Sequence, residues 1–424
     1  MKALFRQYII TFLRFLAKRR LAAVKPTIVG VTGSVGKTGA KEAIADVLER
    51  RKKVKRSKKN YNSEFGAVLT ILEQKTGYSS VAQWLQILWK ASWESLKAPE
   101  SYDTLVMEMG VDAPGDMDEI LRVFTPDIMV FLNVKDAHIG EDQFPNRKAV
   151  YEEKSKAVVA VEKNGWAVLN IDDNFVKQLD GKIPAGCITI GESAEADIRA
   201  TNVRTNEQGL NFDLIYDQKT VPVNLPHVLG DCHVTIALAA IAVGFLQGLP
   251  WSAIEKGLEE FHLPAGRMNK IEGLNDSLII DSSYNASPST MEAALNVLAE
   301  FNGRKIAALG TMNELGELTE SAHLKLGKQA AEKADMVIAV GPQAGRIAEG
   351  AQRGGMSASM IHAFRTSKEA GEFLSRSLSR HDVVLAKGSQ NKVRMEHLVK
   401  ACMKYPEEAR KKLIRQEPYW MTQL

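Results

Sequence analysis

Short apolar runs alternate with longer amphipathic stretches along most of the chain from Thr27 onward. Four of these runs predict buried strands, each followed by a polar turn and a helical pattern: TIVGV, TLVMEM, DIMVFLN and WAVLN. A second series begins near Arg267 and predicts five more strands: SLIID, KIAALG, DMVIAVG, SMIHAF and DVVLAKG. Because strands that alternate with helices are typical of parallel sheets covered by helices, the predicted fold class is α/β.

The pattern changes between the two series. From Gly191 to Leu229 apolar and polar residues alternate, as in GLNFDLIY, which predicts a small antiparallel patch. Val234–Gly248 then predicts a closely packed helix of small residues, and HLPAGR at His262–Arg267 is the expected hinge. We therefore predict two α/β domains, residues 26–265 and 266–424, behind a leader at residues 1–25.

The leader is expected to be a basic amphipathic helix. One helical stripe holds six apolar residues: Phe5, Tyr8, Ile9, Phe12, Leu13 and Leu16. Arg6 and Arg14 interrupt the apolar run, which falls short of the ~18 uninterrupted residues of a membrane span. No small-residue cleavage site of a signal peptide follows. The stripe fits either peripheral contact with a membrane through residues 1–22 or docking on the protein's own next domain, and the pattern leaves both open.

Charge is distributed unevenly along the 424 residues, of which 45% are hydrophobic and 25% charged. Residues 1–59 hold 17 Lys and Arg against three acids, so the remainder carries about −10 of the net charge of +4. The front of the protein should favour anions such as a nucleotide, although RRKKVKRSKK at Arg50–Lys59 also fits a solvated basic face. The three cysteines are far apart and form no C-x-x-C pair, which argues against a disulfide framework or zinc site and favours a reducing cytoplasm.

The stretch TIVGVTGSVGKTGAKEAI at Thr27–Ile44 has the features of a phosphate-binding loop. It departs from G-x-x-x-x-G-K-[ST] because Val31 stands in place of the first glycine. A strand leads into a glycine-bearing turn, and a helix is expected from about Lys37, so that backbone N–H groups face the anion. The expected nucleotide-binding residues are Gly33, Ser34, Val35, Gly36, Lys37 and Thr38, with the Thr38 hydroxyl suited to Mg²⁺.

Further motifs follow in a fixed order along the chain. They are KNYNSEFGAVLTIL, LVMEMG, LNVKDAHIG, EEKSKAV, VLNIDD, GRMNKIE, IIDSSYNASPSTMEAAL, LGTMNELGE and LAKGSQNKVRME. With the lengthened phosphate loop, this series resembles the Mur ligase family over Thr27–Leu424. YNASP and MNELG resemble the branch that adds D-alanyl-D-alanine to a muramoyl tripeptide.

The resemblance implies a P-loop parallel-sheet ATPase domain followed by a Rossmann-like C-terminal domain, and an ATP-dependent carboxylate–amine ligase of peptidoglycan synthesis. The γ-phosphoryl group would pass to a carboxylate, and an amine would displace phosphate from the acyl phosphate. It implies ATP and two Mg²⁺ ions, a muropeptide-type acid, a D-Ala-D-Ala-type amine and a cytoplasmic location, with no nucleic-acid partner.

Site roles also come from the resemblance. Lys37, Lys154, His138 and Arg267 are the implied catalytic residues, and Lys154 is the implied carbamylated lysine. Taken alone, Lys154 is no better a candidate than Lys156. Thr38, Glu108 and His138 are the implied metal ligands. His233, Arg267 and Asp281 are implied nucleotide contacts, and Asn60, Asn62, Glu64, Tyr284 and Asn285 are implied substrate contacts.

The chain also departs from the family pattern. GDCHVTIALAA has His233 and Ile236 where the family has asparagines, and Ser282, Ser287 and Thr311 replace Asp, Asn and Asp. Only the basic leader precedes the phosphate loop, where the family has a uridine-binding domain. Two rivals therefore stay open: the same chemistry on a lipid-linked or other non-UDP acceptor, and a nucleotide-binding scaffold without turnover. The pattern does not decide the oligomeric state.

Overall fold

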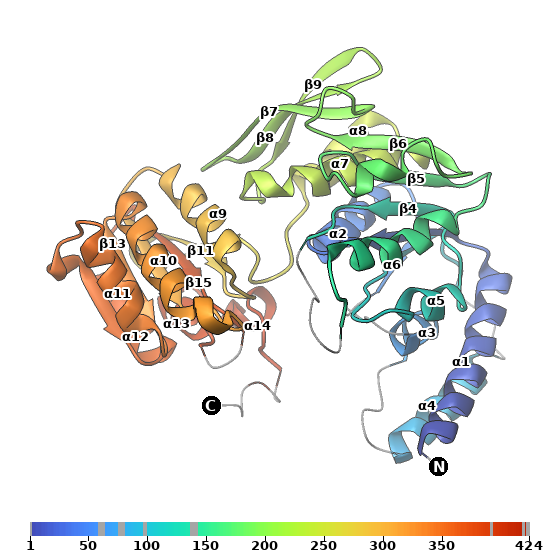
Figure 1. The fold of residues 1–424 in the computed structure, drawn as a ribbon, viewed down its shortest axis with the longest axis horizontal. Helices are drawn as coiled ribbons and strands as arrows, with labels where there is room; N and C mark the ends of the chain where they lie inside the picture. The colour runs from blue at the N-terminus through green and yellow to red at the C-terminus, as the bar shows by residue number, and fades with distance from the viewer. Residues whose placement is uncertain are drawn as a thin grey trace. The chain divides into compact units, whose positions relative to one another are not determined.

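The computed structural model describes residues 2–57, 64–74, 81–95, 100–135, 143–390, 393–417 and 420. It contains two sheets, of nine and six strands, with helices packed against them (Figure 1). The predicted α/β class is confirmed.

The larger sheet has the strand order β2-β3-β1-β4-β5-β6-β7-β8-β9. Its first six strands by sequence are β1 (Thr27–Thr32), β2 (Val54–Arg56), β3 (Thr104–Glu108), β4 (Ile128–Phe131), β5 (Trp166–Asn170) and β6 (Gly186–Gly191). These strands pair in parallel, with β1 between β3 and β4. Every residue of β3 and β4 is buried, as expected for strands covered on both faces.

The last three strands of this sheet are β7 (Ile198–Asn206), β8 (Gly209–Tyr216) and β9 (Lys219–Leu225). Two residues connect β7 to β8, and two connect β8 to β9, which is long enough only for antiparallel neighbours. In the second connection Asp217 and Gln218 both have positive φ, as a tight hairpin turn requires. The antiparallel patch predicted between Gly191 and Leu229 lies here.

Two groups of helices pack on the larger sheet. On one side α2 (Lys37–Leu48), α7 (Val234–Leu246) and α8 (Trp251–Glu259) contact one another. A separate core joins Leu105, Met107 and Phe131 of the strands to five other helices. These helices are α1 (Lys2–Val24), α3 (Glu64–Ile71), α4 (Val81–Ser95), α5 (Asp116–Leu121) and α6 (Arg147–Val159). Because alternate strand residues point to opposite faces, this core marks the second covered face (Figure 1).

The leader forms α1, and the rest of the fold covers only part of the predicted apolar stripe. Ile9, Leu13 and Leu16 are buried against the first unit, whereas Tyr8 and Phe12 are exposed. The aliphatic residues therefore dock on the protein's own fold, whereas the aromatic residues lie along the uncovered edge of the stripe. Nothing is described for the side chain of Phe5.

Three of the six basic residues described in the run at Arg50–Lys59 pair with acidic side chains: Arg50, Lys55 and Arg56. Arg56 contacts three carboxylates at 2.6–2.8 Å. They belong to Glu42 and Asp46 in α2 and to Glu49, the C-cap residue of α2. Lys55 pairs with Glu73 at 2.5 Å. These ion pairs neutralise much of the positive charge that the sequence concentrates here.

The smaller sheet has the order β10-β11-β15-β12-β13-β14. Its strands are β10 (Asn269–Glu272), β11 (Leu278–Ser282), β12 (Lys305–Gly310), β13 (Met336–Val340), β14 (Ile361–Phe364) and β15 (Val383–Lys387). Only the β10–β11 pair among these is antiparallel. The accompanying helices are α9 (Pro288–Ala299), α10 (Thr319–Lys333), α11 (Ala344–Arg353), α12 (Ser367–Ser377), α13 (Glu396–Cys402) and α14 (Ala409–Lys412). Short 3₁₀ turns, η1–η6, lie at Val176–Leu179, Asp231–His233, Leu274–Asp276, Gly316–Leu318, Ala358–Met360 and Pro406–Glu408.

The chain divides into two compact units. The first comprises residues 1–203, 212–224 and 232–261, and the second comprises residues 204–211, 225–231 and 262–424. The domain limits 1–25, 26–265 and 266–424 stay predictions. None of the helices in the described segments has the length and apolar character needed to cross a bilayer. Cys187, Cys232 and Cys402 are free thiols.

Candidate functional site

The phosphate loop joins the end of β1 to the start of α2. Gly33 has φ +151° and Gly36, at the N-cap of α2, has φ +88°, conformations that residues with a Cβ rarely adopt. A Cβ on Gly33 would also lie 3.1 Å from Leu132 Cβ. The glycines therefore allow the tight turn that points the first N–H groups of α2 out of the sheet edge.

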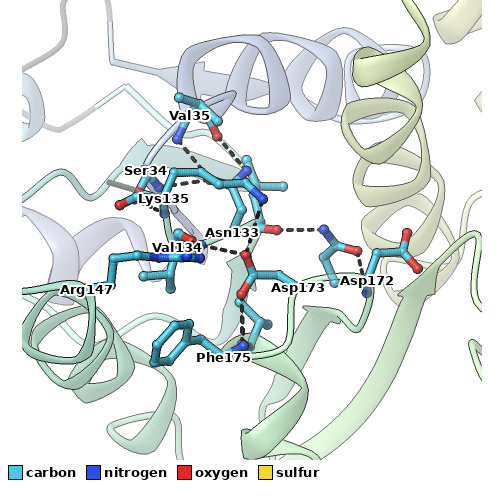
Figure 2. Close-up of polar contacts among 12 residues, drawn as sticks. Ser34, Val35, Asn133, Val134, Lys135, Arg147, Asp172, Asp173 and Phe175 are labelled. Carbon is cyan, nitrogen blue, oxygen red and sulfur yellow. Dashed lines mark hydrogen bonds and ion pairs between the residues drawn. The ribbon is translucent and has the colours of Figure 1, made fainter. Parts of the chain in front are cut away.

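Asn133, two residues after the end of β4, holds the tip of this loop by hydrogen bonds (Figure 2). Its Oδ1 accepts hydrogen bonds from the backbone N–H groups of Ser34 and Val35 at 3.2 and 3.0 Å, and its Nδ2 donates to the Val35 carbonyl at 3.0 Å. The Ser34 N–H also donates to the Asn133 carbonyl. The segment after β4 is itself held, because Asp173 accepts from the Val134 N–H at 3.0 Å and Arg147 donates to the Val134 carbonyl at 2.8 Å (Figure 2).

Lys37 and Thr38 begin α2 at the carboxyl end of β1. The Lys37 ammonium donates to the carbonyls of Gly33 and Ser34 at 2.8 and 3.1 Å, so it lies over its own loop. The Thr38 hydroxyl donates to Glu108 Oε2 at 3.0 Å. Glu108 ends β3, which pairs with β1, so parallel pairing brings these two oxygens together.

Lys154 lies in α6 with 1% of its surface exposed, and its Nζ has no hydrogen-bond partner among the described residues. Burial, followed by the charge of Lys37, lowers the pKa of Lys154 to about 7, against the opposing effect of Asp112, Glu153 and Glu108. Lys154 is therefore close enough to the phosphate loop to sense Lys37, and a large fraction of it is a neutral amine near neutral pH.

Lys156, the alternative candidate, has a different environment. Its ammonium contacts Asp118 at 2.6 Å and Glu153 at 2.7 Å, and these hydrogen bonds raise its pKa. A fully charged, paired lysine is a poor nucleophile toward carbon dioxide. The structure thus distinguishes two lysines that the sequence pattern does not.

His233 is the N-cap residue of α7. A Cβ on Gly36 would lie 3.9 Å from Ile236 Cγ1, so the first turn of α7 lies against the phosphate loop. His233 therefore lies on a helix that borders the expected nucleotide site. Its neighbour Cys232 has its Sγ 3.9 Å from His233 Nδ1.

Three predicted site residues, Asn60, Asn62 and His138, lie outside the described residues. Glu64 is the first residue of α3, and only its backbone is described. Within the described segments no group of three or more His, Cys, Asp and Glu side chains could hold a metal ion. Thr38 and Glu108 are the two predicted metal ligands that the structure brings together.

The remaining predicted residues belong to the second unit. The Arg267 guanidinium lies 4.3 Å from the centre of the Tyr284 ring. The backbone N–H of Arg267 donates to Asn269 Oδ1 at 2.9 Å. Lys387 donates to the Asn285 carbonyl at 2.9 Å. Arg267, Tyr284 and Asn285 are thus held on one surface loop region beside the end of β11.

Asp281, near the end of β11, is fully buried. Its Oδ1 accepts from the Ser283 N–H at 3.0 Å, while its Oδ2 has no partner among the described residues. Burial raises the pKa of Asp281 to about 6, partly offset by the hydrogen bonds from Ser283. This carboxyl group lies inside the unit, and its contact with the nucleotide stays a prediction.

Arg415, a buried residue, holds the same loop by hydrogen bonds to its backbone. It donates to the carbonyls of Ser283 and Tyr284 at 3.3 and 2.5 Å and pairs with Glu396 at 3.0 Å. Glu396 is fully buried and also pairs with Arg394 at 3.1 Å. Because Arg415 is bound on one side by a carboxylate and on the other by two carbonyls, it fixes the backbone that carries Tyr284.

Sequence reasoning missed Asn133, Arg147, Asp173 and Arg415. Asn133 carries a usable signal, because it is a polar residue within two positions of the end of a buried parallel strand, and Glu108 likewise lies at the end of β3. Arg415 carries none, because two of its partners are backbone carbonyls more than 130 residues away in the chain, and no local pattern marks the third, Glu396, as buried.

Comparison with family models gives two matches. The Mur ligase middle domain matches residues 31–244, and the Mur ligase glutamate ligase domain matches residues 266–390. Together they cover most of the chain.

Several curated relatives carry the name UDP-N-acetylmuramoyl-tripeptide–D-alanyl-D-alanine ligase. The protein of Bacillus subtilis (strain 168) is 28% identical over 400 residues, which is 94% of this chain and 80% of the relative. The Synechocystis protein is 30% identical over 82% of this chain and 70% of the relative. The Escherichia coli (strain K12) protein is 29% identical over 76% of this chain and 66% of the relative.

Solved structures with this name share the fold. A crystal structure of MurF from Acinetobacter baumannii has a TM-score of 0.78 at 28% identity, covering 92% of this chain and 79% of that one. MurF from Thermotoga maritima in complex with ADP has a TM-score of 0.73 at 25% identity, covering 95% of this chain and 84% of that one.

Proposed function

The chain belongs to the Mur ligase family, and from that premise we propose that it joins D-alanyl-D-alanine to a muramoyl tripeptide with ATP, as a step of peptidoglycan precursor synthesis. The observation that carries this proposal is the phosphate loop with Thr38 hydrogen-bonded to Glu108 and with the unpartnered amine of Lys154 close to Lys37. The likeness to ligases of that name over most of the chain supports the choice of substrates.

The chemistry is the activation of a carboxylate. A carboxylate resists attack by an amine because its leaving group would be oxide. Transfer of the γ-phosphoryl group from ATP forms an acyl phosphate and ADP; the amine nitrogen then attacks the acyl carbon, loses a proton, and inorganic phosphate leaves. Such reactions depend on positioning and on neutralising the charge of the transferred group.

The first unit supplies the nucleotide side of this reaction. The amides at the start of α2 face the phosphates, and the Lys37 ammonium, already over the loop, neutralises their charge. We propose that Asn133 and Ser34 keep the loop in this shape, and that His233 on the adjoining helix contacts the base.

Thr38 and Glu108 fit a Mg²⁺ ion. Their oxygens lie 3.0 Å apart, and a hydroxyl and a carboxylate at that separation are both ligands that Mg²⁺ accepts beside phosphate oxygens. When bound there, Mg²⁺ supplies charge neutralisation for the γ-phosphoryl group. A second ion at His138 is part of the proposal from the sequence motif.

Lys154 fits carbamylation by carbon dioxide. Only a neutral amine attacks carbon dioxide, and about half of a buried amine with a pKa of about 7 is neutral at pH 7. The modification would replace the buried amine, whose Nζ has no hydrogen-bond partner among the described residues, by an anion beside the cation of Lys37. We propose Lys154, and not Lys156, as the modified residue.

In the second unit, Arg267 is proposed to reach the nucleotide phosphates and Tyr284 and Asn285 to contact a substrate. Asn60, Asn62 and Glu64 are proposed for the acceptor side. Because the reaction consumes ATP, we place it in the cytoplasm, with residues 1–22 available for peripheral contact with the inner face of the membrane.

The decisive experiment is incubation of the full chain with ATP, Mg²⁺, UDP-muramoyl tripeptide and D-Ala-D-Ala, followed by mass spectrometry. The expected result is a product heavier by one dipeptide residue, with ADP and phosphate released only when both acid and amine are present. ADP release without a product, or a product only from a non-UDP acceptor, would overturn the choice of substrates. Binding of ATP without turnover on any acid would favour the scaffold.

A further inference from the structure

Helix α1 has an outward row of aromatic side chains. Tyr8, Phe12 and Phe15 are 75%, 43% and 60% exposed, respectively. Their spacing of four and three residues places them on one face, opposite the buried residues Ile10 and Leu13. The helix is thus apolar on both sides: one side is packed in the first unit, and the other faces solvent.

Helix α4, which packs against α1, has a second such row. Trp89 and Trp93 are 68% and 54% exposed, and their rings stack with centroids 6.2 Å apart and planes 9° apart. Ile87 and Ala91, on another side of α4, are buried. Tyr8, Phe12, Phe15, Trp89 and Trp93 are called the aromatic surface below; α1 and α4 run side by side in the first unit (Figure 1).

Positive charge continues this surface along α1. Lys18 and Arg19 are exposed and follow Phe15 by three and four residues, so they lie on the same face. No ion pair is found for either side chain within the described residues. Helix α1 contains six basic residues and no acidic residue, and Lys90 is exposed next to Trp89.

The chemistry of these side chains matches one class of partner. Tryptophan and tyrosine are favoured at the boundary between lipid head groups and acyl chains, where the ring is half in water. Lysine and arginine beside them attract anionic head groups, each contributing on the order of 1 kcal/mol near such a surface. A protein partner would bury the rings equally well, but the exposed Lys18 and Arg19 beside the rings favour the anionic surface of a membrane over an uncharged protein face. Arg14 and Arg20 of the same helix already pair with Glu119 and Glu73.

We propose that the aromatic surface binds an anionic phospholipid membrane, with the rings at the level of the head groups and Lys18 and Arg19 on the phosphates. This inference is independent of the ligase reaction, because none of these residues belongs to the nucleotide or substrate sites. It deepens the proposed peripheral contact of residues 1–22 by assigning it to the uncovered aromatic edge of the α1 stripe together with α4.

Vesicle flotation of the full chain tests the inference. Vesicles of phosphatidylcholine alone are compared with vesicles that contain 30% phosphatidylglycerol, at 0.1 M and 0.5 M NaCl. The variants are Trp89→Ser/Trp93→Ser, Tyr8→Ser/Phe12→Ser/Phe15→Ser and Lys18→Ser/Arg19→Ser. Tyr405→Ser, an exposed aromatic residue of the second unit, is the matched control.

The wild type and Tyr405→Ser are expected to float with anionic vesicles and to be released by high salt. Each variant of the surface should bind at least about tenfold more weakly, because aromatic burial and charge each supply part of the affinity. Tryptophan fluorescence of the wild type should be quenched by brominated lipids, and this quenching should fall in Trp89→Ser/Trp93→Ser.

The inference would be overturned if the wild type stayed in the unbound fraction, or if the variants floated as well as the wild type. It would also be overturned if the wild type bound no lipid but formed a dimer in gel filtration, and only the surface variants were monomers. The last result would assign the surface to a second copy of the chain. Thermal unfolding and ADP release with water-soluble substrates should be the same for all variants, so that a folding defect, or failure of the proposed ligase activity, is recognised separately.

Discussion

Thr38 at the start of α2 and Glu108 at the end of β3 share a hydrogen bond of 3.0 Å, although 70 residues separate them in the chain. The contact exists because β1 and β3 are parallel neighbours whose carboxyl ends meet at one edge of the sheet. The contact places a residue of the phosphate loop next to a carboxylate from a distant part of the sequence.

Glu108→Gln is expected to lower kcat for ADP formation by about 100- to 1000-fold, as for the loss of one well-placed group that stabilises charge. The amide keeps a hydrogen-bond acceptor for Thr38 but has no negative charge for Mg²⁺. The Mg²⁺ concentration that gives half-maximal rate should therefore rise. Glu260→Gln, which removes an exposed carboxylate paired with Arg50, should leave both values unchanged.

Lys154→Met is expected to stabilise the fold, in CO₂-free buffer, by an amount that depends on pH. The pKa of Lys154 is about 7 in the folded protein, against the ordinary lysine value of 10.5 in the unfolded chain. Between these values only the unfolded chain carries the proton, so wild-type stability rises with pH. Below pH 7 Lys154 is protonated in both the folded and the unfolded state, and the folded state bears the full cost of a buried cation.

The advantage of Lys154→Met should thus be largest near pH 6 and shrink toward pH 10, with a change on the order of a few kcal/mol. Urea unfolding at pH 6, 8 and 9.5 measures it. Lys156→Met, in which a half-exposed paired lysine is removed, should change stability by less than about 1 kcal/mol. A constant difference between Lys154→Met and the wild type across this range would contradict the assigned pKa.

Local patterns in the sequence predicted the elements and the phosphate loop, because buried strands and a glycine-bearing turn leave signals within a few residues. The sequence pattern did not decide between Lys154 and Lys156, because their difference lies in burial and in partners on other elements. The sequence pattern left the partner of the apolar stripe of α1 open for a related reason. Both sides of this helix are apolar, and only the packing against α3 and α4 shows which side is covered.

Asn133→Ala is expected to weaken ADP binding by about tenfold or more, because a net contribution near 1 kcal/mol is lost for each of the hydrogen bonds that shape the loop. Calorimetric titration with ADP measures the change. Asn133→Asp keeps the acceptor for two amides but places a negative charge near the phosphates, so it should bind no better than the alanine variant. Asn174→Ala, at an exposed position after β5, should bind ADP as the wild type does.

Arg415→Met is expected to cost about 3–5 kcal/mol of stability, the typical loss when one partner of a buried ion pair is removed. Glu396 would keep only Arg394, and the carbonyls of Ser283 and Tyr284 would lose their donor. Urea unfolding measures the loss. Lys412→Met, which breaks an exposed pair with Glu408, should cost less than about 1 kcal/mol, and equal losses would show that burial of Arg415 is unimportant.

Asp281→Asn is expected to stabilise the protein at pH 7.5 but to have little effect at pH 4. Burial raises the pKa of Asp281 from 3.8 to about 6, so between these values the folded protein holds a proton that the unfolded chain has lost. Wild-type stability therefore falls as pH rises through this window, and above pH 6 the folded state bears the cost of a buried, partly unpartnered carboxylate.

An asparagine has no charge to bury, so the difference between Asp281→Asn and the wild type should grow from pH 4 to pH 6 and then stay level. Asp276→Asn is the control of opposite sign, because the Lys404 ammonium lowers the pKa of that exposed carboxyl group, and its contribution is present at neutral pH and lost as pH falls. Unfolding curves at pH 4, 5, 6 and 7.5 distinguish the two. If Asp281→Asn were less stable than the wild type at pH 7.5, the ionised carboxylate of Asp281 would stabilise the folded state. That result would contradict the assignment of its raised pKa to burial.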